Sequence, residues 1–160
     1  MSTALDHVIA TALHYLGTPY KWGGDDPSGF DCSGFVLELL KTAGFVGETD
    51  DLTADGLLRK YAHKQVAVPI AGALLFYLDT QGKAYHVVFC LDGDFLIGAN
   101  SGTSKTLDPV PKFTLATAFD YLIALVKSVT NSAAWRDNAY IKIRPIKFNP
   151  ATMKVVYLFG

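Results

Sequence analysis

Residues 29–45, GFDCSGFVLELLKTAGF, place one cysteine between an aspartate and a serine, directly before an apolar run. The apolar positions recur at helical spacing and stop at Gly44, so the stretch predicts a buried helix that begins at or beside Cys32. At a helix N-terminus, unpaired N–H groups and the helix dipole favour a reactive thiolate. The alternative is a small core residue in a turn, because free cysteine is among the most buried residue types.

The loop before this helix, GTPYKWGGDDPSGFD at residues 17–31, is rich in glycine and proline, and loops of that kind often carry function. We expect Gly29 and Gly34 to leave room beside the sulfur for a substrate backbone, which favours catalysis over simple burial. The second cysteine, Cys90, lies inside the apolar run HVVFCL and is assigned to the core. Both cysteines are expected to be free thiols.

A nucleophilic thiol needs a base, and the four histidines differ in their surroundings. His7 and His14 fall on the polar side of a helix predicted at residues 3–16, and His63 lies in the polar run RKYAHKQ. His86 lies in AYHVVFCL, where both faces of the predicted strand are apolar. A histidine there must be functional or a hydrogen-bonded core residue.

The remaining pattern predicts helices first and a sheet second. A capping box of Thr3 and Asp6 opens the first helix, and Thr53 caps a short one that reaches about Tyr61. Alternating runs then predict an antiparallel meander, a further helix, a strand with Lys142 and Arg144 outward, and an edge strand. These segments are 73–79, 84–91 and 94–100 for the meander, 113–129 for the helix, 140–146 for the strand and 154–159 for the edge strand. The whole chain, 1–160, is expected to be one α+β domain.

Composition narrows the classes of function. The 160 residues are 50% hydrophobic and carry a net charge of −1, which gives no reason to expect binding to nucleic acid or to a membrane. The sequence lacks four cysteine or histidine residues at zinc-finger spacing, so we do not expect a structural metal. We also expect no cofactor. The N-terminus does not resemble a secretory signal and no apolar run reaches the roughly 18 residues of a membrane span. We therefore expect synthesis in the cytoplasm.

Two segments resemble one known family. GTPYKWGGDDPSGFDCSGFV at residues 17–36 and YHVVFCLDGDFLIGANSG at residues 85–102 are similar to the signature of the NlpC/p60 family of papain-like cysteine peptidases. These bacterial and phage enzymes cut the peptide stems of peptidoglycan. The resemblance implies a papain-like NlpC-type fold, in which the cysteine helix and its neighbouring helices pack on a central antiparallel sheet that bears the histidine.

The resemblance assigns Cys32 as nucleophile and His86 as its partner. Tyr20, Asp31 and Ser33 fall where the family contacts the substrate peptide. The alternatives are loop packing for Tyr20, a helix cap for Asp31, and an ordinary first-turn residue for Ser33.

One position departs from the family. A third polar residue usually orients the catalytic imidazole, and here Gly98 stands in its place. Asn100 lies two residues on, hence on the same strand face, and is the candidate to reach His86 directly or through a water. Its alternative is a turn residue at the strand end.

The implied activity is hydrolysis of the bond between γ-D-glutamate and a diamino acid in peptidoglycan stem peptides. One alternative is a CHAP-like amidase that cuts another bond of peptidoglycan. Another is a degenerate, non-catalytic domain that binds peptidoglycan or forms part of a phage tail. Since the wall lies outside the cytoplasm, delivery by a phage or a secretion machine is expected, with recycling of imported muropeptides as a third route.

Overall fold

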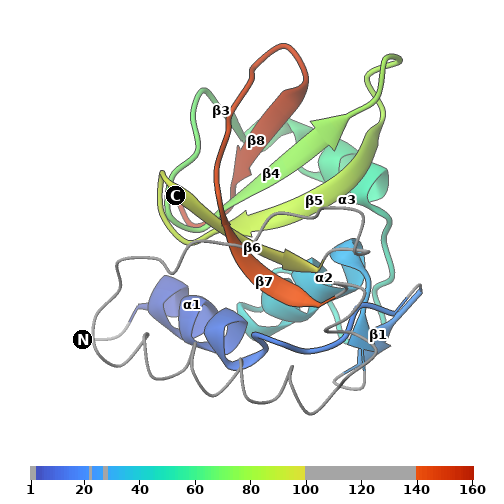
Figure 1. The fold of residues 1–160 in the computed structure, drawn as a ribbon, viewed down its shortest axis with the longest axis vertical. Coiled ribbons are helices and arrows are strands. Elements are labelled where there is room, and N and C mark those ends of the chain that lie inside the picture. The colour runs from blue at the N-terminus through green and yellow to red at the C-terminus, as the bar shows by residue number, and fades with distance from the viewer. Residues whose placement is uncertain (1–2, 22, 27–28, 100–139) are drawn as a thin grey trace.

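The computed structural model describes residues 3–21, 23–26, 29–99 and 140–160, in which helices pack on a twisted sheet (Figure 1). The helices are α1 (Ala4–His14), α2 (Cys32–Thr42), α3 (Ala54–Lys60) and the short 3-10 helix η1 (Ala62–Lys64). The strands are β1 (Asp25–Asp26), β2 (Gly29–Phe30), β3 (Gln65–Val66), β4 (Ala73–Leu78), β5 (Ala84–Cys90), β6 (Phe95–Ala99), β7 (Ile141–Pro145) and β8 (Met153–Tyr157).

The first and third helices begin at the side-chain caps that the sequence predicts. The Thr3 backbone N–H donates to the Asp6 carboxylate at 2.8 Å, and the Asp6 N–H donates to the Thr3 hydroxyl at 3.1 Å, which completes the capping box. The Thr53 hydroxyl accepts from the Gly56 N–H at 3.0 Å and starts α3. Each cap satisfies N–H groups that a helix start leaves without partners.

The larger sheet has six strands in the order β3-β8-β4-β5-β6-β7, and its neighbours all pair antiparallel. Strands β4, β5 and β6 form the predicted meander. The prediction of an edge strand at residues 154–159 is wrong, because β8 pairs with β4 on one side and β3 on the other. The two-residue β3 is too short to show a pattern in the sequence, so the covered edge was not foreseen.

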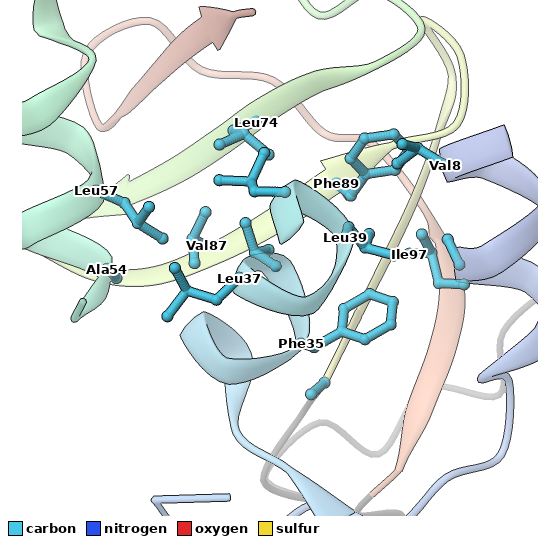
Figure 2. Packing of buried hydrophobic residues seen from close by; sticks show 14 of the residues in the cluster. Val8, Phe35, Leu37, Leu39, Ala54, Leu57, Leu74, Val87, Phe89 and Ile97 are labelled. Carbon is cyan, nitrogen blue, oxygen red and sulfur yellow. The ribbon is translucent and has the colours of Figure 1, made fainter. Parts of the chain in front are cut away.

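The main core lies between α2 and one face of the sheet, with α1 and α3 on either side of the helix (Figure 2). Phe35 and Leu39 of α2 are fully buried, as are Val87 and Phe89 of β5. Burying each such side chain contributes roughly 1.5–3 kcal/mol. This packing presses the start of α2 against β5, the strand that carries His86.

The opposite face of the sheet is also covered. A second apolar cluster gathers there, made of Ala73, Leu75, Val88, Cys90, Leu96 and Val155. Lys142 is accordingly only 3% exposed and Arg144 is half-buried, so the prediction that both point outward is wrong. Simple alternation of polar and apolar residues assumes one face open to water, and this sheet has none over its centre.

The helix predicted at residues 113–129 lies outside the described residues. Among the helices that the structure describes, none combines the length and apolar character needed to cross a membrane.

Candidate active site

Cys32 is the first residue of α2, and Asp31 is the N-cap. The Asp31 carboxylate accepts hydrogen bonds from the Gly34 N–H at 2.7 Å and from the Gly23 N–H at 3.2 Å, and the Ser33 hydroxyl donates to it at 3.3 Å. One carboxylate therefore fixes both the start of the helix and the loop before it.

The glycines around the cysteine serve the packing of the loop itself. A Cβ on Gly34 would collide with the Gly24 carbonyl oxygen, and a Cβ on Gly29 would lie 2.6 Å from the Cβ of Lys21. The expectation that Gly29 and Gly34 leave space for a substrate is therefore wrong, because the Lys21 side chain and the Gly24 backbone fill that space.

Backbone bonds tie the same loop to the far edge of the sheet. The Gly17 N–H donates to the Ile141 carbonyl at 2.9 Å, and the Ile141 N–H donates to the Thr18 carbonyl at 2.8 Å. The Phe30 N–H donates to the Pro19 carbonyl at 3.1 Å. Strand β7 and the strand before Cys32 thus hold the loop from both sides.

These bonds place Tyr20 beside the cysteine. Tyr20 bridges Phe30, two residues before Cys32. Burial raises the pKa of the Tyr20 hydroxyl, and the neighbouring ionisable groups of Cys32 and Asp31 raise it further, as expected when the three groups are close together. The structure therefore brings together four of the residues chosen from the sequence: Tyr20, Asp31, Cys32 and Ser33.

The Cys32 sulfur lies against β5 near the backbone N–H of Val87, which favours the thiolate and acts to lower the pKa of the thiol. The β5–β6 register runs over Phe89↔Ile97 and Cys90↔Leu96, and a continued ladder would pair Val87 with Ala99. Within the described residues the register does not extend to that pair. The backbone N–H of Val87, beyond the last pair of this register, therefore lies beside the sulfur.

His86 directly precedes Val87. Its imidazole ring lies 5.3 Å from the Tyr77 ring, centroid to centroid, and the two residues are partners across β4 and β5. Because neighbouring strand residues point to opposite faces, the imidazole lies on the face opposite the Val87 side chain. The sulfur meets the strand between these two faces, beside the peptide that joins His86 to Val87.

The site rests in its neutral form. Burial raises the pKa of the Cys32 thiol, against the backbone N–H groups of Val87, Ser33 and Cys32, and the Asp31 charge adds to the rise. Burial lowers the pKa of His86 to about 4, and Arg144 adds to that fall. The expectation of a depressed thiol pKa is wrong, because desolvation outweighs the helix N-terminus. At neutral pH Cys32 is therefore a thiol and His86 a neutral imidazole.

The position of the family's third polar residue holds no ring. Gly98 is buried, and a Cβ there would lie 2.6 Å from Val88 Cγ1. Lys142 is its partner on β7. Val88 thus occupies the volume that a side chain at residue 98 would need. Asn100, the predicted replacement, lies outside the described residues.

Asp55 supports the site and was missed in the sequence. Its buried carboxylate accepts from the Ala84 N–H at 3.1 Å and pairs with the Arg59 side chain at 2.7 Å. Ala84 starts β5, two residues before His86, so Asp55 anchors that strand to α3. An aspartate in the first turn of a helix is ordinarily explained by the helix dipole, so the sequence held no distinct signal.

The other histidines and the second cysteine match the predictions. His7, His14 and His63 are exposed, and Cys90 is a fully buried free thiol whose pKa burial raises to about 12. Among the residues described here, no group of three or more His, Cys, Asp or Glu side chains is placed to hold a metal ion.

Residues 17–136 match the NlpC/P60 family, over a range that takes in the loop, the cysteine helix and the histidine strand and that exceeds half of the chain. The chain belongs to the NlpC/P60 family. The NlpC/p60 domain of the peptidoglycan hydrolase SagA has a similar fold, with a TM-score of 0.58 and 26% identity, over 96% of this chain and 98% of that one. The likeness confirms the predicted α+β fold of NlpC type.

Curated relatives of this NlpC/P60 chain are longer proteins. Protein P54 of Enterococcus faecium is 40% identical over 95 residues, which are 58% of this chain and 17% of that protein. The probable peptidoglycan endopeptidase LytE of Bacillus subtilis is 32% identical over 100 residues, which are 62% of this chain and 28% of that protein. The gamma-D-glutamyl-L-lysine dipeptidyl-peptidase of Bacillus subtilis is 35% identical over 107 residues, which are 64% of this chain and 34% of that protein. The chain thus spans a third or less of the first two relatives and 34% of the third.

Proposed function

We propose that this NlpC/P60 domain is a cysteine peptidase that hydrolyses peptidoglycan stem peptides at the bond between γ-D-glutamate and a diamino acid. The observation that carries the proposal is the Cys32 sulfur against the β5 backbone at Val87, the residue after His86, with Tyr20 and Asp31 next to it. The relatives named for peptidoglycan and for the γ-D-glutamyl-L-lysine bond support the choice of substrate.

The neutral pair defines the order of proton transfers. As the Cys32 sulfur attacks the carbonyl carbon, its proton passes to the imidazole of His86, and a thioester forms when the amine leaves with that proton. Water, activated by the same imidazole, then hydrolyses the thioester. The lowered pKa of His86 keeps the ring in the basic form that the first step requires.

The start of α2 supplies donors for the oxyanion. Asp31 already occupies the Gly34 N–H, whereas the N–H groups of Cys32 and Ser33 lie near the sulfur and act to lower its pKa. A carbonyl oxygen bound beside the sulfur would therefore meet the Cys32 N–H. Removing a donor of this type costs on the order of 3 kcal/mol of transition-state stabilisation.

Tyr20, Asp31 and Ser33 are proposed to bind the stem peptide. The Asp31 carboxylate and the Tyr20 hydroxyl lie beside the sulfur, so a peptide with a free N-terminal ammonium would place that positive charge against Asp31. The bond two residues along would then lie at the sulfur. Asp31 thus combines a cap with a binding role.

Asn100 is proposed to orient the imidazole of His86, directly or through a water. Replacing Asn100 with alanine should lower kcat by less than about tenfold if a water does the orienting. A loss as large as that of His86→Ala would assign Asn100 a direct role instead.

Digestion of purified muropeptides, with products identified by mass, tests the function. We expect products cut after γ-D-glutamate with the wild type and none with Cys32→Ala. Products cut at another bond would favour a CHAP-like amidase. Binding to muropeptides without any product would favour a non-catalytic domain of the same fold.

Delivery to the cell wall by a phage or a secretion machine is a further part of the proposal. Lysis of bacteria on co-expression with a holin, but not without one, would support it. Equal lysis in both cases would count against it.

A further inference from the structure

Tyr85 occupies an irregular position next to His86. The β4–β5 register passes from Tyr77↔His86 to Leu78↔Ala84, so Tyr85 is an extra residue with no partner on β4. A bulge of this kind bends a strand and re-aims a side chain, and bulges are common beside active sites. Here it leaves Tyr85 outside the β4–β5 ladder, directly before His86.

The Tyr85 ring is exposed and fixed in place. It is 65% exposed. Among the described residues, the other exposed large hydrophobic side chains are Val68, at 56%, and Ile70, at 38%. The Tyr77 ring lies 6.4 Å from the Tyr85 ring and 5.3 Å from the His86 ring, centroid to centroid. Tyr77 therefore joins the exposed ring to the catalytic imidazole.

The proposed proton transfer from His86 to the leaving amine indicates which part of the substrate comes close to the Tyr85 ring. His86 must pass its proton to the leaving amine, so that nitrogen has to come within about 3 Å of the imidazole. The amine belongs to the residue after the cleaved bond. The side chain of that residue therefore starts a few bonds from the imidazole, within reach of a neighbouring aromatic ring.

We propose that Tyr85 determines specificity for the residue after the cleaved bond, by packing its ring against the hydrocarbon chain of a diamino acid. This inference rests on the proposed function and adds the contact that selects the leaving residue. A tyrosine ring offers a broad apolar surface with few rotatable bonds, and the long methylene chain of lysine or diaminopimelate covers it well. The side chain of alanine is too short to do so.

Three synthetic peptides test the contact: L-Ala-γ-D-Glu followed by L-lysine, by norleucine or by L-alanine. Norleucine keeps the hydrocarbon chain of lysine and lacks its amine. For Tyr85→Ala we expect kcat/KM to fall about fivefold to tenfold with lysine and norleucine and to stay within about twofold with alanine. Tyr85→Phe, which keeps the ring, should match the wild type.

Ile70→Ala is the matched control, since it removes an exposed apolar side chain elsewhere and should change none of the three rates. Because Tyr85 is exposed, the unfolding temperature of Tyr85→Ala should equal that of the wild type. An equal effect on all three peptides, or none on any, would overturn the inference while leaving the proposed function intact. A wild type that cleaves none of them would overturn both.

Discussion

The Cys32 sulfur lies near the backbone N–H of Val87, the residue that directly follows His86 on β5, and that N–H acts to lower the pKa of the thiol. Among the described residues, this part of β5 lies beyond the last β5–β6 pair of the register, Phe89↔Ile97. The proposed nucleophile and the strand of the proposed base are therefore brought together by two separate elements, the start of α2 and the β5 backbone at Val87.

The pH dependence of the reaction should reflect the unusual imidazole. Since a neutral His86 must accept the proton and its pKa is lowered to about 4, kcat/KM should stay level as the pH falls to 5 and drop only near pH 4. Arg144→Gln removes a charge that adds to this lowering, so the drop should move to higher pH. Lys147→Gln, an exposed control, should leave it unchanged. A drop centred near pH 6.5 in the wild type would contradict the buried neutral ring.

The same ring should make stability depend on pH. In the folded state His86 stays neutral down to about pH 4, whereas in the unfolded chain it is protonated below about 6.5. The unfolded state thus binds more protons between these values, and the free energy of unfolding should fall by up to about 3 kcal/mol as the pH decreases from 6.5 to 4. Urea titrations of the wild type and His86→Asn measure this. The account fails here if the two proteins show the same slope.

Gly98 and Val88 should be coupled. A Cβ at residue 98 would lie 2.6 Å from Val88 Cγ1, so Gly98→Ala should destabilise the fold by about 1–3 kcal/mol through overpacking. Val88→Ala removes the obstructing methyl groups and leaves a cavity. The double substitution should therefore cost less than the sum of the two single ones. Additive costs in a double-mutant cycle would show that the two side chains do not compete for one volume.

Two substitutions of Asp31 should separate its role as the cap of α2 from its proposed role in binding the peptide. Asp31→Ala removes the cap of α2 and should lower the free energy of unfolding by about 1 kcal/mol, whereas Asp31→Asn keeps a capping oxygen and should lower it less. If the carboxylate also binds an ammonium, both variants should raise KM for a peptide with a free N-terminus. An N-acetylated peptide should show no such rise. If Asp31→Asn has the same KM as the wild type for the peptide with a free N-terminus, Asp31 caps the helix and does not bind the ammonium.

Local patterns predicted much of this fold. The Thr3 and Thr53 caps, the helix that begins at Cys32 and the three-strand meander all depend on residues close in sequence. The errors arose where distant segments meet. The place of β8 inside the sheet, the burial of Lys142 and the bulge at Tyr85 all depend on pairing across the sheet, which alternation alone does not encode.

In the candidate site, too, local motifs were predicted correctly, whereas features that depend on distant segments were not. Motif resemblance selected Cys32, His86 and Tyr20, and the structure places Tyr20 beside Cys32 and the Cys32 sulfur next to the strand of His86. Their protonation was misjudged because burial depends on the packing of α2 against the sheet. The support from Asp55 was missed because its partner, Ala84, is far away in the sequence.

The most direct test is kcat/KM on L-Ala-γ-D-Glu-L-Lys for the wild type, Cys32→Ala, His86→Ala and the double variant, with unfolding temperatures measured alongside. In the proposed mechanism the sulfur and the imidazole act as one unit, so each single variant should lose at least about 10⁴-fold and the double variant should lose no more. Cys32→Ala that still cleaves this peptide at a rate near that of the wild type would contradict the account.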